Sequence, residues 1–397
     1  RADNAPVPAP HIRRLFQTLF IPELLYTVGW GLILPVLPRL ATNVSGSVAG
    51  AAAIVTLVAV GTLVVDIPAG VLAARWPQRT LTLAVLGTLA VAGLLAAFGG
   101  SVLLLGAAAL LLGAGRGTWM VTRMAVARET VPAHQRGRAL ATLGGMNRIG
   151  SFAVGPAVGG AVAELFGLWA PFLALSCLMI LAGAAVLRWT PRRPPAPARA
   201  GGWYHPVAIV RDHWRMLLRA GPAIIALNLI RAGRQLFIPL WGESIGLSVA
   251  EVGLAMSASG IADMLLFYPT GVVMDRLGRR WAAASSIAVM SLSLALMPLT
   301  GSFLSLLLIG ILAGAGNGLG SGFLMTMGTD LAPKRGAGEF IGLWRLIGDV
   351  GTAGGPALIG AVAGILSLAV AGPVVGLFGF TGAALFIFSV KETLRRR

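Results

Sequence analysis

The stretch Tyr268-Pro-Thr-Gly-Val-Val-Met-Asp-Arg-Leu-Gly-Arg-Arg-Trp281 is a short polar hinge between two long apolar runs. Earlier in the chain, Val65-Asp-Ile-Pro-Ala-Gly-Val-Leu-Ala-Ala-Arg-Trp-Pro-Gln-Arg79 occupies a similar position. At an offset of 201 residues the two stretches align in four pairs of like residues: Pro68 with Pro269, Gly70 with Gly271, Arg75 with Arg276 and Arg79 with Arg280. The match indicates that the two halves of the chain repeat one structural plan.

The composition indicates a membrane protein. Hydrophobic residues make up 56% of the 397 residues and charged residues only 11%, with a mean hydropathy of +0.84. A soluble domain carries about 25% charged residues, whereas many runs here reach the ~20 apolar residues that cross a bilayer as a helix. The 54 glycines and 23 prolines are compatible with membrane helices, where small residues let backbones approach closely. We therefore predict an all-α protein with several membrane spans.

The repeat extends along most of the chain. The offset of 201 also aligns Pro38 with Pro239, Ser47 with Ser248, Gly113-Ala-Gly115 with Gly314-Ala-Gly316 and Pro132 with Pro333, and an offset of 200 aligns Gly155-Pro156 with Gly355-Pro356. So constant a register is hard to obtain by chance. Two halves in the same orientation imply a pseudo-two-fold axis along the membrane normal, with a binding site between them near the midplane.

Twelve spans are predicted, six in each half: 14–40, 47–74, 79–99, 101–130, 137–166 and 168–189, then 218–243, 248–275, 279–300, 302–331, 338–366 and 368–391. The Pro- and Arg-rich segment from Pro191 to Gly202 reads as a linker. We therefore divide the chain into a six-helix bundle (1–189), a cytoplasmic linker (190–217) and a second six-helix bundle (218–397). Residues 206–219 mix apolar side chains with arginines and predict either a helix in the membrane interface or an ordered loop.

The net charge of +17 lies almost entirely in short segments between apolar runs. Basic loops face the cytoplasm, so both termini and the linker are expected inside the cell. Nucleic-acid binding would require a soluble basic face, and the sequence has none. We expect a multi-pass protein of the bacterial inner (cytoplasmic) membrane.

The hinge in the second half carries a family motif. Its residues Gly271, Asp275, Arg276, Gly278, Arg279 and Arg280 match the pattern G-x-x-x-D-R-x-G-R-R/K between spans two and three of the major facilitator superfamily. The chain resembles these transporters over essentially its whole length. In the first-half copy (Gly70, Arg75, Arg79), Ala74 replaces the acid and Pro77 the second glycine. The resemblance implies that both hinges are gate loops. We expect Asp275 to accept hydrogen bonds from the start of span five near Gly137.

Span five resembles a second motif, G-x-x-x-G-P-x-x-G-G, of the antiporter branch of this family. The matching residues are Gly155, Pro156, Gly159 and Gly160, with Ser151 in place of the first glycine, and span eleven repeats Gly355 and Pro356. Small residues one turn apart admit a facing helix, and proline weakens the local helical ladder. The spacing fits plain helix packing equally well, whereas the resemblance favours an antiporter.

Ionisable residues at membrane depth are costly and are therefore candidate functional residues. The acids are Glu23, Asp66, Asp263 and Asp349, and the bases are Arg116, Arg148, Arg231, Arg234 and Arg345. Glu23 resembles the span-one acid of drug–proton antiporters. Arg116 begins the fourth-span pattern R-x-x-Q-G, although Trp119 and Met120 replace its last two residues. We expect a Glu23–Arg116 pair that exchanges a proton, because burial favours a neutral carboxyl and a guanidinium favours a charged one. The alternative is a permanently charged structural pair.

The remaining candidates have other expected roles. Asp263 is a second proton-coupling candidate, and Asp66 is expected to brace the gate loop. Asp349 can pair with Arg345 four residues before it on one helix face. The residues predicted to line a substrate cavity are Tyr26, Trp30, Trp119, Arg231, Arg234 and Asp349.

These features predict a secondary transporter and not an enzyme. We predict proton-coupled efflux, by antiport and alternating access, of small amphiphilic molecules or drugs. The alternative is a proton symporter or facilitator for an anionic, zwitterionic or lipid-like metabolite, because deep arginines outnumber deep acids. No phosphate-binding G-x-x-x-x-G-K-[ST] loop occurs, and we expect neither a cofactor nor a metal. The expected partners are a small-molecule substrate, protons and the lipid bilayer, and the expected state is a monomer.

Overall fold

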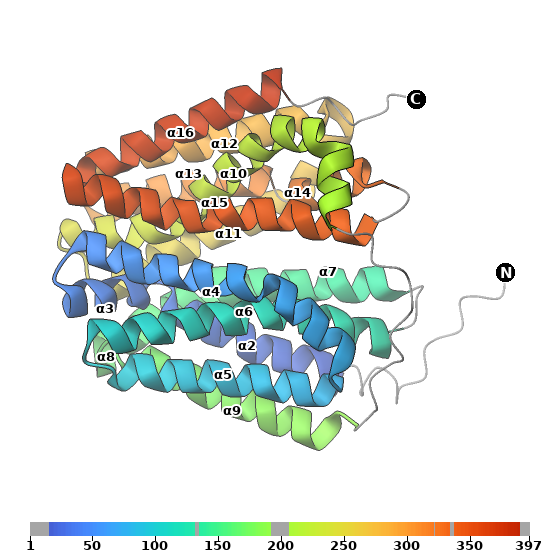
Figure 1. Cartoon of the computed structure of the whole chain (residues 1–397). Helices are drawn as coiled ribbons and strands as arrows, with labels where there is room; N and C mark the ends of the chain where they lie inside the picture. Colours follow the sequence, from blue (N-terminus) through green and yellow to red (C-terminus); the bar gives the residue numbers. More distant parts are fainter. Residues whose placement is uncertain (1–15, 132–134, 192–205, 321, 334–336, 390–397) are drawn as a thin grey trace.

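The computed structural model describes residues 16–131, 135–191, 206–320, 322–333 and 337–389. Within these ranges the chain forms helices and no strands. Figure 1 shows the helices of the first half, coloured blue to green, packed beside those of the second half, coloured yellow-green to red. Most helices run in nearly the same direction, as the predicted pair of membrane bundles requires.

The first half contains two helical paths interrupted near a proline. Ile33 ends one helix and Val36 begins the next, with a bend of 44° around Pro35. A π-helical turn precedes Pro156, whose ring cannot continue the regular hydrogen-bond ladder. The elements are η1 (Phe16–Phe20), α2 (Ile21–Ile33), α3 (Val36–Ser45), α4 (Val48–Arg75), α5 (Gln78–Phe98), α6 (Val102–Thr130), α7 (Arg136–Asn147), η3 (Arg148–Val154), α8 (Gly155–Phe166) and α9 (Ala170–Trp189).

The second half has the same order of spans but is interrupted at a different place. The predicted span 302–331 is divided around Gly322, whose φ of 79° lies in the left-handed region that glycine accommodates without strain. The elements are α10 (Pro206–Ser244), α11 (Val249–Leu277), α12 (Arg279–Leu296), η4 (Met297–Leu299), α13 (Phe303–Leu319), α14 (Phe323–Leu331), α15 (Ala337–Ile365) and α16 (Leu368–Phe388).

The described helices account for the predicted spans. Ten of them are long and apolar enough to cross a bilayer, and the bent pair α2–α3 gives an eleventh. The helix α13 is equally apolar but has 17 residues, because the break near Gly322 shortens the tenth predicted span. These helices confirm the all-α membrane fold.

The predicted linker is partly helical. The helix α10 begins at Pro206 and continues through the seventh predicted span to Ser244. Residues 206–217 are therefore helical and continuous with that span. Of the two interpretations offered by the sequence, helix is the one observed. Residues 192–205 lie outside the described part of the chain, and the boundary between the bundles stays a prediction.

The sequence repeat is visible in the helix starts. Ser47 and Ser248 are the N-caps of α4 and α11, and each side chain accepts a hydrogen bond from a backbone N–H three residues later. Ser101 and Ser302, also 201 residues apart, cap α6 and α13 in the same way. A serine N-cap satisfies an otherwise unpaired N–H of the first turn. The repeat therefore sets equivalent helix starts in both halves.

The repeat also sets the closest helix contacts. A Cβ added at Gly113 of α6 would lie 1.9 Å from the carbonyl oxygen of Val58 in α4. A Cβ added at Gly314 of α13 would lie 1.9 Å from the carbonyl oxygen of Ser259 in α11. The two glycines are 201 residues apart, and so are the two residues whose carbonyl oxygens they approach. The two halves therefore use the same close approach of helix backbones.

The halves meet along two seams. In one, a Cβ at Gly253 of α11 would lie 2.3 Å from the Pro156 oxygen of α8. In the other, a Cβ at Gly360 of α15 would lie 2.6 Å from Ala52 of α4. Both contacts lie near the starts of α4 and α11.

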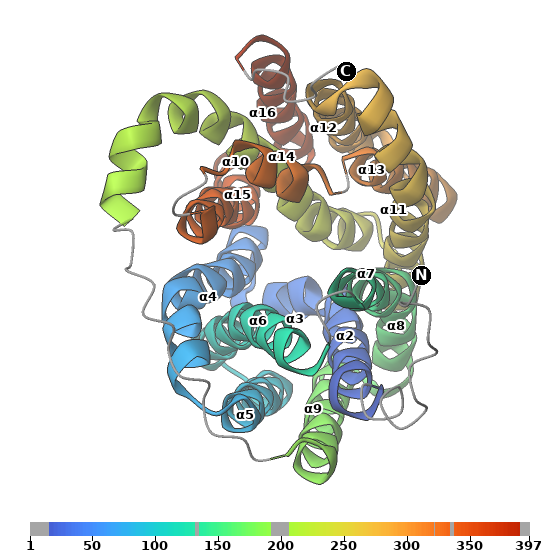
Figure 2. The ribbon, with the colours of Figure 1, turned by 90° about the vertical axis from the view of Figure 1, so that its right-hand side faces the viewer.

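The two ends of the bundles are named by their connections. The turn end contains the turns 45–48 and 244–249. The hinge end, opposite to it, contains the hinges 75–78 and 277–279. Close helix packing closes the turn end. Figure 2 shows the helices nearly end-on, viewed from the hinge end.

We predict that Gly113→Ala and Gly314→Ala both lower the melting temperature of the purified protein in detergent. The added methyl meets a main-chain oxygen that cannot rotate away, and overpacking costs about 1–3 kcal/mol. Gly87→Ala in α5 is the control, because a Cβ there meets no atom within 4 Å. Equal melting temperatures for all four proteins, measured by thermal unfolding, would contradict the repeated close approach.

Candidate functional site

A cavity of about 240 Å³ lies between the two halves. Its wall combines aliphatic side chains with a few polar groups. The polar and charged members are Thr62 and Arg116 from the first half, and Asn228, Gln235, Arg345, Asp349 and Thr352 from the second. Apolar walls with a small number of polar groups are the usual form of a small-molecule site. The position between the halves is the one that the repeat predicted.

Arg116 contributes a positive charge to the cavity wall. Its guanidinium lies over the ring of Trp30, 5.0 Å from the ring centroid, and both residues line the cavity. Among the described acids, none forms an ion pair with Arg116. The tryptophan face offers a weaker cation–π attraction. The wall therefore presents a guanidinium that is available to an anion.

Glu23 pairs with a different arginine from the predicted one. Its carboxylate accepts a hydrogen bond from Arg123 and a second from Trp119 Nε1 at 2.9 Å, and only 1% of the residue is exposed. The predicted Glu23–Arg116 pair is therefore wrong. Arg123 lies seven residues after Arg116 on α6, which is two turns along the same helix face. This seven-residue spacing is the sequence signal that marks Arg123 as a second possible partner of Glu23 beside Arg116.

A smaller pocket of about 30 Å³ connects these groups. Arg116 and Arg123 line it together with Tyr26 and Trp30. The ring of Tyr26 stacks on Trp119, with centroids 4.9 Å apart, and on Trp30, with centroids 6.4 Å apart. Trp30 and Arg116 line both this pocket and the large cavity. The Glu23–Arg123 pair thus lies close to a path that leads into the cavity.

Two ion pairs cross from one half to the other. Arg345 Nη2 in α15 lies 3.2 Å from Asp66 Oδ1 in α4. Arg148 Nη1 in η3 lies 2.7 Å from Asp263 Oδ2 in α11. The expectation that Asp66 braces the gate loop is therefore wrong, because its partner is on the other bundle. Arg345 Nε also lies 3.5 Å from Asp349 Oδ2, as the four-residue spacing suggested.

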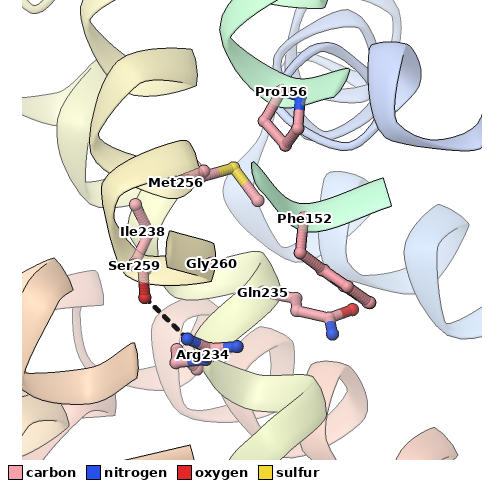
Figure 3. Close-up of a pocket in the computed structure, with 8 residues that line it drawn as sticks. All are labelled: Phe152, Pro156, Arg234, Gln235, Ile238, Met256, Ser259 and Gly260. Carbon is pink, nitrogen blue, oxygen red and sulfur yellow. Dashed lines mark hydrogen bonds between the residues drawn. The ribbon is translucent and has the colours of Figure 1, made fainter. Parts of the chain in front are cut away.

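The arginines of span seven take separate positions. Arg234 Nη1 donates to Ser259 Oγ at 2.6 Å, and the residue lines a pocket of about 10 Å³ between η3–α8, α10 and α11 (Figure 3). Arg231 Nη2 donates to the Gly320 carbonyl oxygen at 2.8 Å. Neither arginine lines the large cavity. Of the residues predicted to line it, Trp30 and Asp349 do so, and Tyr26 lines the smaller pocket.

The hinge residues make contacts within their own bundles. Arg79 donates to the Leu187 carbonyl oxygen at 2.9 Å, and Arg279 Nε lies 3.1 Å from Asp330 Oδ2. Arg280 donates to the Ile387 carbonyl oxygen at 3.4 Å. Gly278, with φ of 104°, separates α11 from α12. The side chains of Asp275 and Arg276 lie outside the described part of the structure, so the expected contact of Asp275 stays a prediction.

The residues of the glycine–proline motif lie at helix crossings. A Cβ on Gly159 would lie 2.0 Å from the Leu32 oxygen of α2, and one on Gly160 would lie 2.5 Å from the Val249 oxygen of α11. In the second half, a Cβ on Gly355 would lie 2.4 Å from the Leu229 oxygen of α10. Pro356 lines the large cavity. These glycines pack helices, and Gly160 of α8 forms part of the seam between the halves.

The chain was compared with known proteins. A family model described as Major Facilitator Superfamily matches residues 19–233 and 223–397. A hexuronate transporter of Bacillus subtilis (strain 168) is 28% identical over 168 residues, which span 41% of this chain and 39% of that protein.

Solved structures share the fold. A POT family transporter in complex with 5-aminolevulinic acid superposes with a TM-score of 0.75 at 12% identity, over 95% of this chain and 96% of that one. A mutant nucleoside transporter superposes with a TM-score of 0.77 at 14% identity, over 95% and 100%. At these identities the likeness concerns the fold alone. Because the family model matches both halves, this chain is a multi-pass membrane transporter that belongs to the Major Facilitator Superfamily.

Proposed function

We propose that this transporter moves a small anionic metabolite, with the charge and size of a sugar acid, across the membrane together with protons. The observation that carries the proposal is Arg116, a guanidinium in the wall of the cavity between the halves with no described acidic partner. A charge at membrane depth is costly unless it is paired. A carboxylate substrate would supply the missing charge through charge-assisted hydrogen bonds, which are the strong ones.

The cavity also suits the rest of such a molecule. Its volume of about 240 Å³ is slightly below the ~300 Å³ at which pockets for drug-sized ligands begin, which favours a small substrate. Asn228 and Gln235 carry amides that can both donate to and accept from hydroxyl groups. The relative named as a hexuronate transporter supports the same substrate class, since a hexuronate carries one carboxylate and several hydroxyls.

The arrangement around Glu23 supports coupling to protons. As a carboxylate, Glu23 holds Arg123. A proton on Glu23 would remove the charge that holds this guanidinium and leave Arg123 available to an anion in the pocket that it shares with Arg116. Protonation would thereby strengthen anion binding, and linkage requires that the anion strengthen proton binding by the same factor. Binding of both together favours symport over the antiport that the sequence analysis predicted.

The distribution of basic residues supports an assignment of the two ends to the two faces of the membrane. The turn end is closed by the seams between α8 and α11 and between α4 and α15. The basic segments gather at the hinge end, which the positive-inside rule assigns to the cytoplasm. We therefore assign the turn end to the outer face of the cytoplasmic membrane. The monomeric state stays a prediction.

Proton-coupled efflux of amphiphilic molecules is the second candidate. The observation in its favour is the largely aliphatic cavity wall, which includes Ile33, Leu37 and Val55. Such a wall accepts apolar substrates without specific hydrogen bonds. Proteoliposomes with an imposed pH gradient separate the two candidates. Uptake of a hexuronate driven by an acidic exterior supports symport, and export of a cationic amphiphile supports antiport.

We predict that Arg116→Gln weakens the apparent affinity for the anionic substrate by about 10- to 100-fold in this assay. The loss corresponds to one hydrogen bond to a charged group, about 1.5–3 kcal/mol. Arg219→Gln is the matched control, because Arg219 is exposed on α10 and does not line the cavity. An unchanged affinity in Arg116→Gln would remove the observation on which the proposed substrate class rests.

We predict that Glu23→Gln abolishes accumulation driven by a pH gradient and preserves exchange of labelled for unlabelled substrate at equal pH. The glutamine side chain keeps the shape of a neutral carboxyl but cannot release a proton. The control is Asp212→Asn, which removes an exposed acid from α10. Concentrative uptake by the Glu23 variant would place the coupling proton elsewhere.

A further inference from the structure

The two ion pairs between the halves are related by the internal repeat. Asp66 and Asp263 are 197 residues apart, and so are Arg148 and Arg345. In each pair, an acid on α4 or α11 meets an arginine on the opposite bundle, in η3 or α15. The offset differs from 201 by four residues, about one helical turn, in both partners. The two bridges therefore correspond to each other with a shift of one helical turn. A charged side chain that is present at one bridge and missing at the other would give the two bridges different chemistry.

One bridge has such a group. Arg345 lies 3.2 Å from Asp66 Oδ1 and 3.5 Å from Asp349 Oδ2, so one guanidinium faces two carboxyl groups. Asp66 belongs to the first half and Asp349 to the second. Because both contact the same guanidinium, the two carboxyl groups lie close together. At the other bridge, the position equivalent to Asp349 at the same offset is Phe152.

The oxygen atoms of this cluster are incompletely satisfied. Asp66 Oδ2 and Asp349 Oδ2 are both buried, and neither accepts a hydrogen bond. The side chain of Asp66 is 11% exposed and that of Asp349 is 21% exposed. With both carboxyls ionised, the cluster carries two negative charges and one positive charge. Carboxylates that share a site cannot both ionise easily, and a single proton between them satisfies both orphan oxygens and cancels the excess charge.

The surroundings offer no other described counter-charge for the second carboxylate. The helix α6, which packs against α4, presents Met120 to Arg345, with Nη2 and Sδ 3.6 Å apart. Its Arg116 is the other charged residue in the wall of the adjoining cavity. From α10, which packs against α15, the same cavity receives the uncharged Asn228 and Gln235. The described charged group in contact with the two acids is therefore Arg345, and Arg116 lines the same cavity as Asp349.

We propose that Asp66 and Asp349 form a proton-binding carboxyl pair that joins the two halves around Arg345. With the proton bound, the carboxyl O–H of one residue donates to the carboxylate of the other and adds a hydrogen bond between the bundles. Without it, the two carboxylates repel each other and the α4–α15 seam loosens. Acidification therefore stabilises the conformation seen here, in which Asp66 and Arg345 join the bundles in the hinge-end parts of α4 and α15. This site is separate from Glu23 and does not depend on the proposed substrate.

Infrared difference spectroscopy on the purified full chain tests the site directly. Between mildly alkaline and mildly acidic pH, we expect the wild type to gain a C=O stretching band of a protonated carboxyl. Asp66→Asn and Asp349→Asn should each lose this band, because the remaining carboxylate then has Arg345 to itself and stays charged. Either variant suffices if the other does not fold. Asp263→Asn, at the equivalent bridge, and Glu23→Gln are controls that should keep it.

The outcomes separate this proposal from the proposed function. In the Glu23→Gln background, where Glu23 contributes no carboxyl band, a band that survives in Asp66→Asn or in Asp349→Asn overturns the carboxyl pair. A band that disappears in Asp263→Asn or in Glu23→Gln alone also overturns it. Failure of Glu23→Gln to uncouple transport leaves this result unchanged, since the band is measured without substrate.

The mechanical consequence is measured with spin labels at Trp76→Cys and Gly342→Cys in a Cys177→Ser background. Trp76 is exposed at the end of α4 and Gly342 is exposed on α15. We expect acidification to narrow the distance distribution between the labels, and Asp349→Asn to make the distribution independent of pH. A pH response that persists in Asp349→Asn overturns the proposed bridge.

Discussion

A charged side chain that lies between two membrane-embedded helix bundles is stable only where an opposite charge meets it. This constraint connects most of the polar chemistry in the molecule. Arg345 and Arg148 reach from one bundle to acids on the other, and Arg123 reaches Glu23 within the first bundle. Alternating access moves one bundle against the other, so the bridges between them must break or exchange partners during transport. Conformation, protonation and substrate charge are thereby coupled through the same few groups.

The two halves share their scaffold but not their charges. Serine caps and glycine contacts recur at an offset of 201 residues, as at Gly113 and Gly314. At that offset Glu23 corresponds to Ile224, Arg116 to Asn317 and Arg123 to Leu324. Helix packing is needed in both bundles, so its determinants are kept in both. A buried charge has to be present once only, and each additional copy would require another partner in a medium that solvates charge poorly.

The bridges between the halves show how the shared scaffold supports different chemistry. Both pair an acid with an arginine across the interface, at equivalent places in the repeat. Around Arg345 the second acid, Asp349, creates an excess of negative charge. Around Asp263, the span-seven arginines Arg231 and Arg234 lie nearby and create an excess of positive charge. The same geometry is therefore surrounded by different charges at the two bridges.

The sequence by itself determined the membrane class, the repeated halves and the place of the cavity. The length of each apolar run decides whether a helix can span the bilayer, and the spacing of small residues decides where helices can approach closely; both are visible in the sequence alone. It also listed most of the deep charged residues. It could not assign their partners. Arg116 and Arg123 lie on one face of α6, and which of them reaches Glu23 depends on how far α2 is displaced along α6. Only the tertiary structure decides such axial displacements, since they result from the close packing of glycines against backbone on neighbouring helices. For the same reason, the partner of Asp66 was found on the opposite bundle and not in its own hinge.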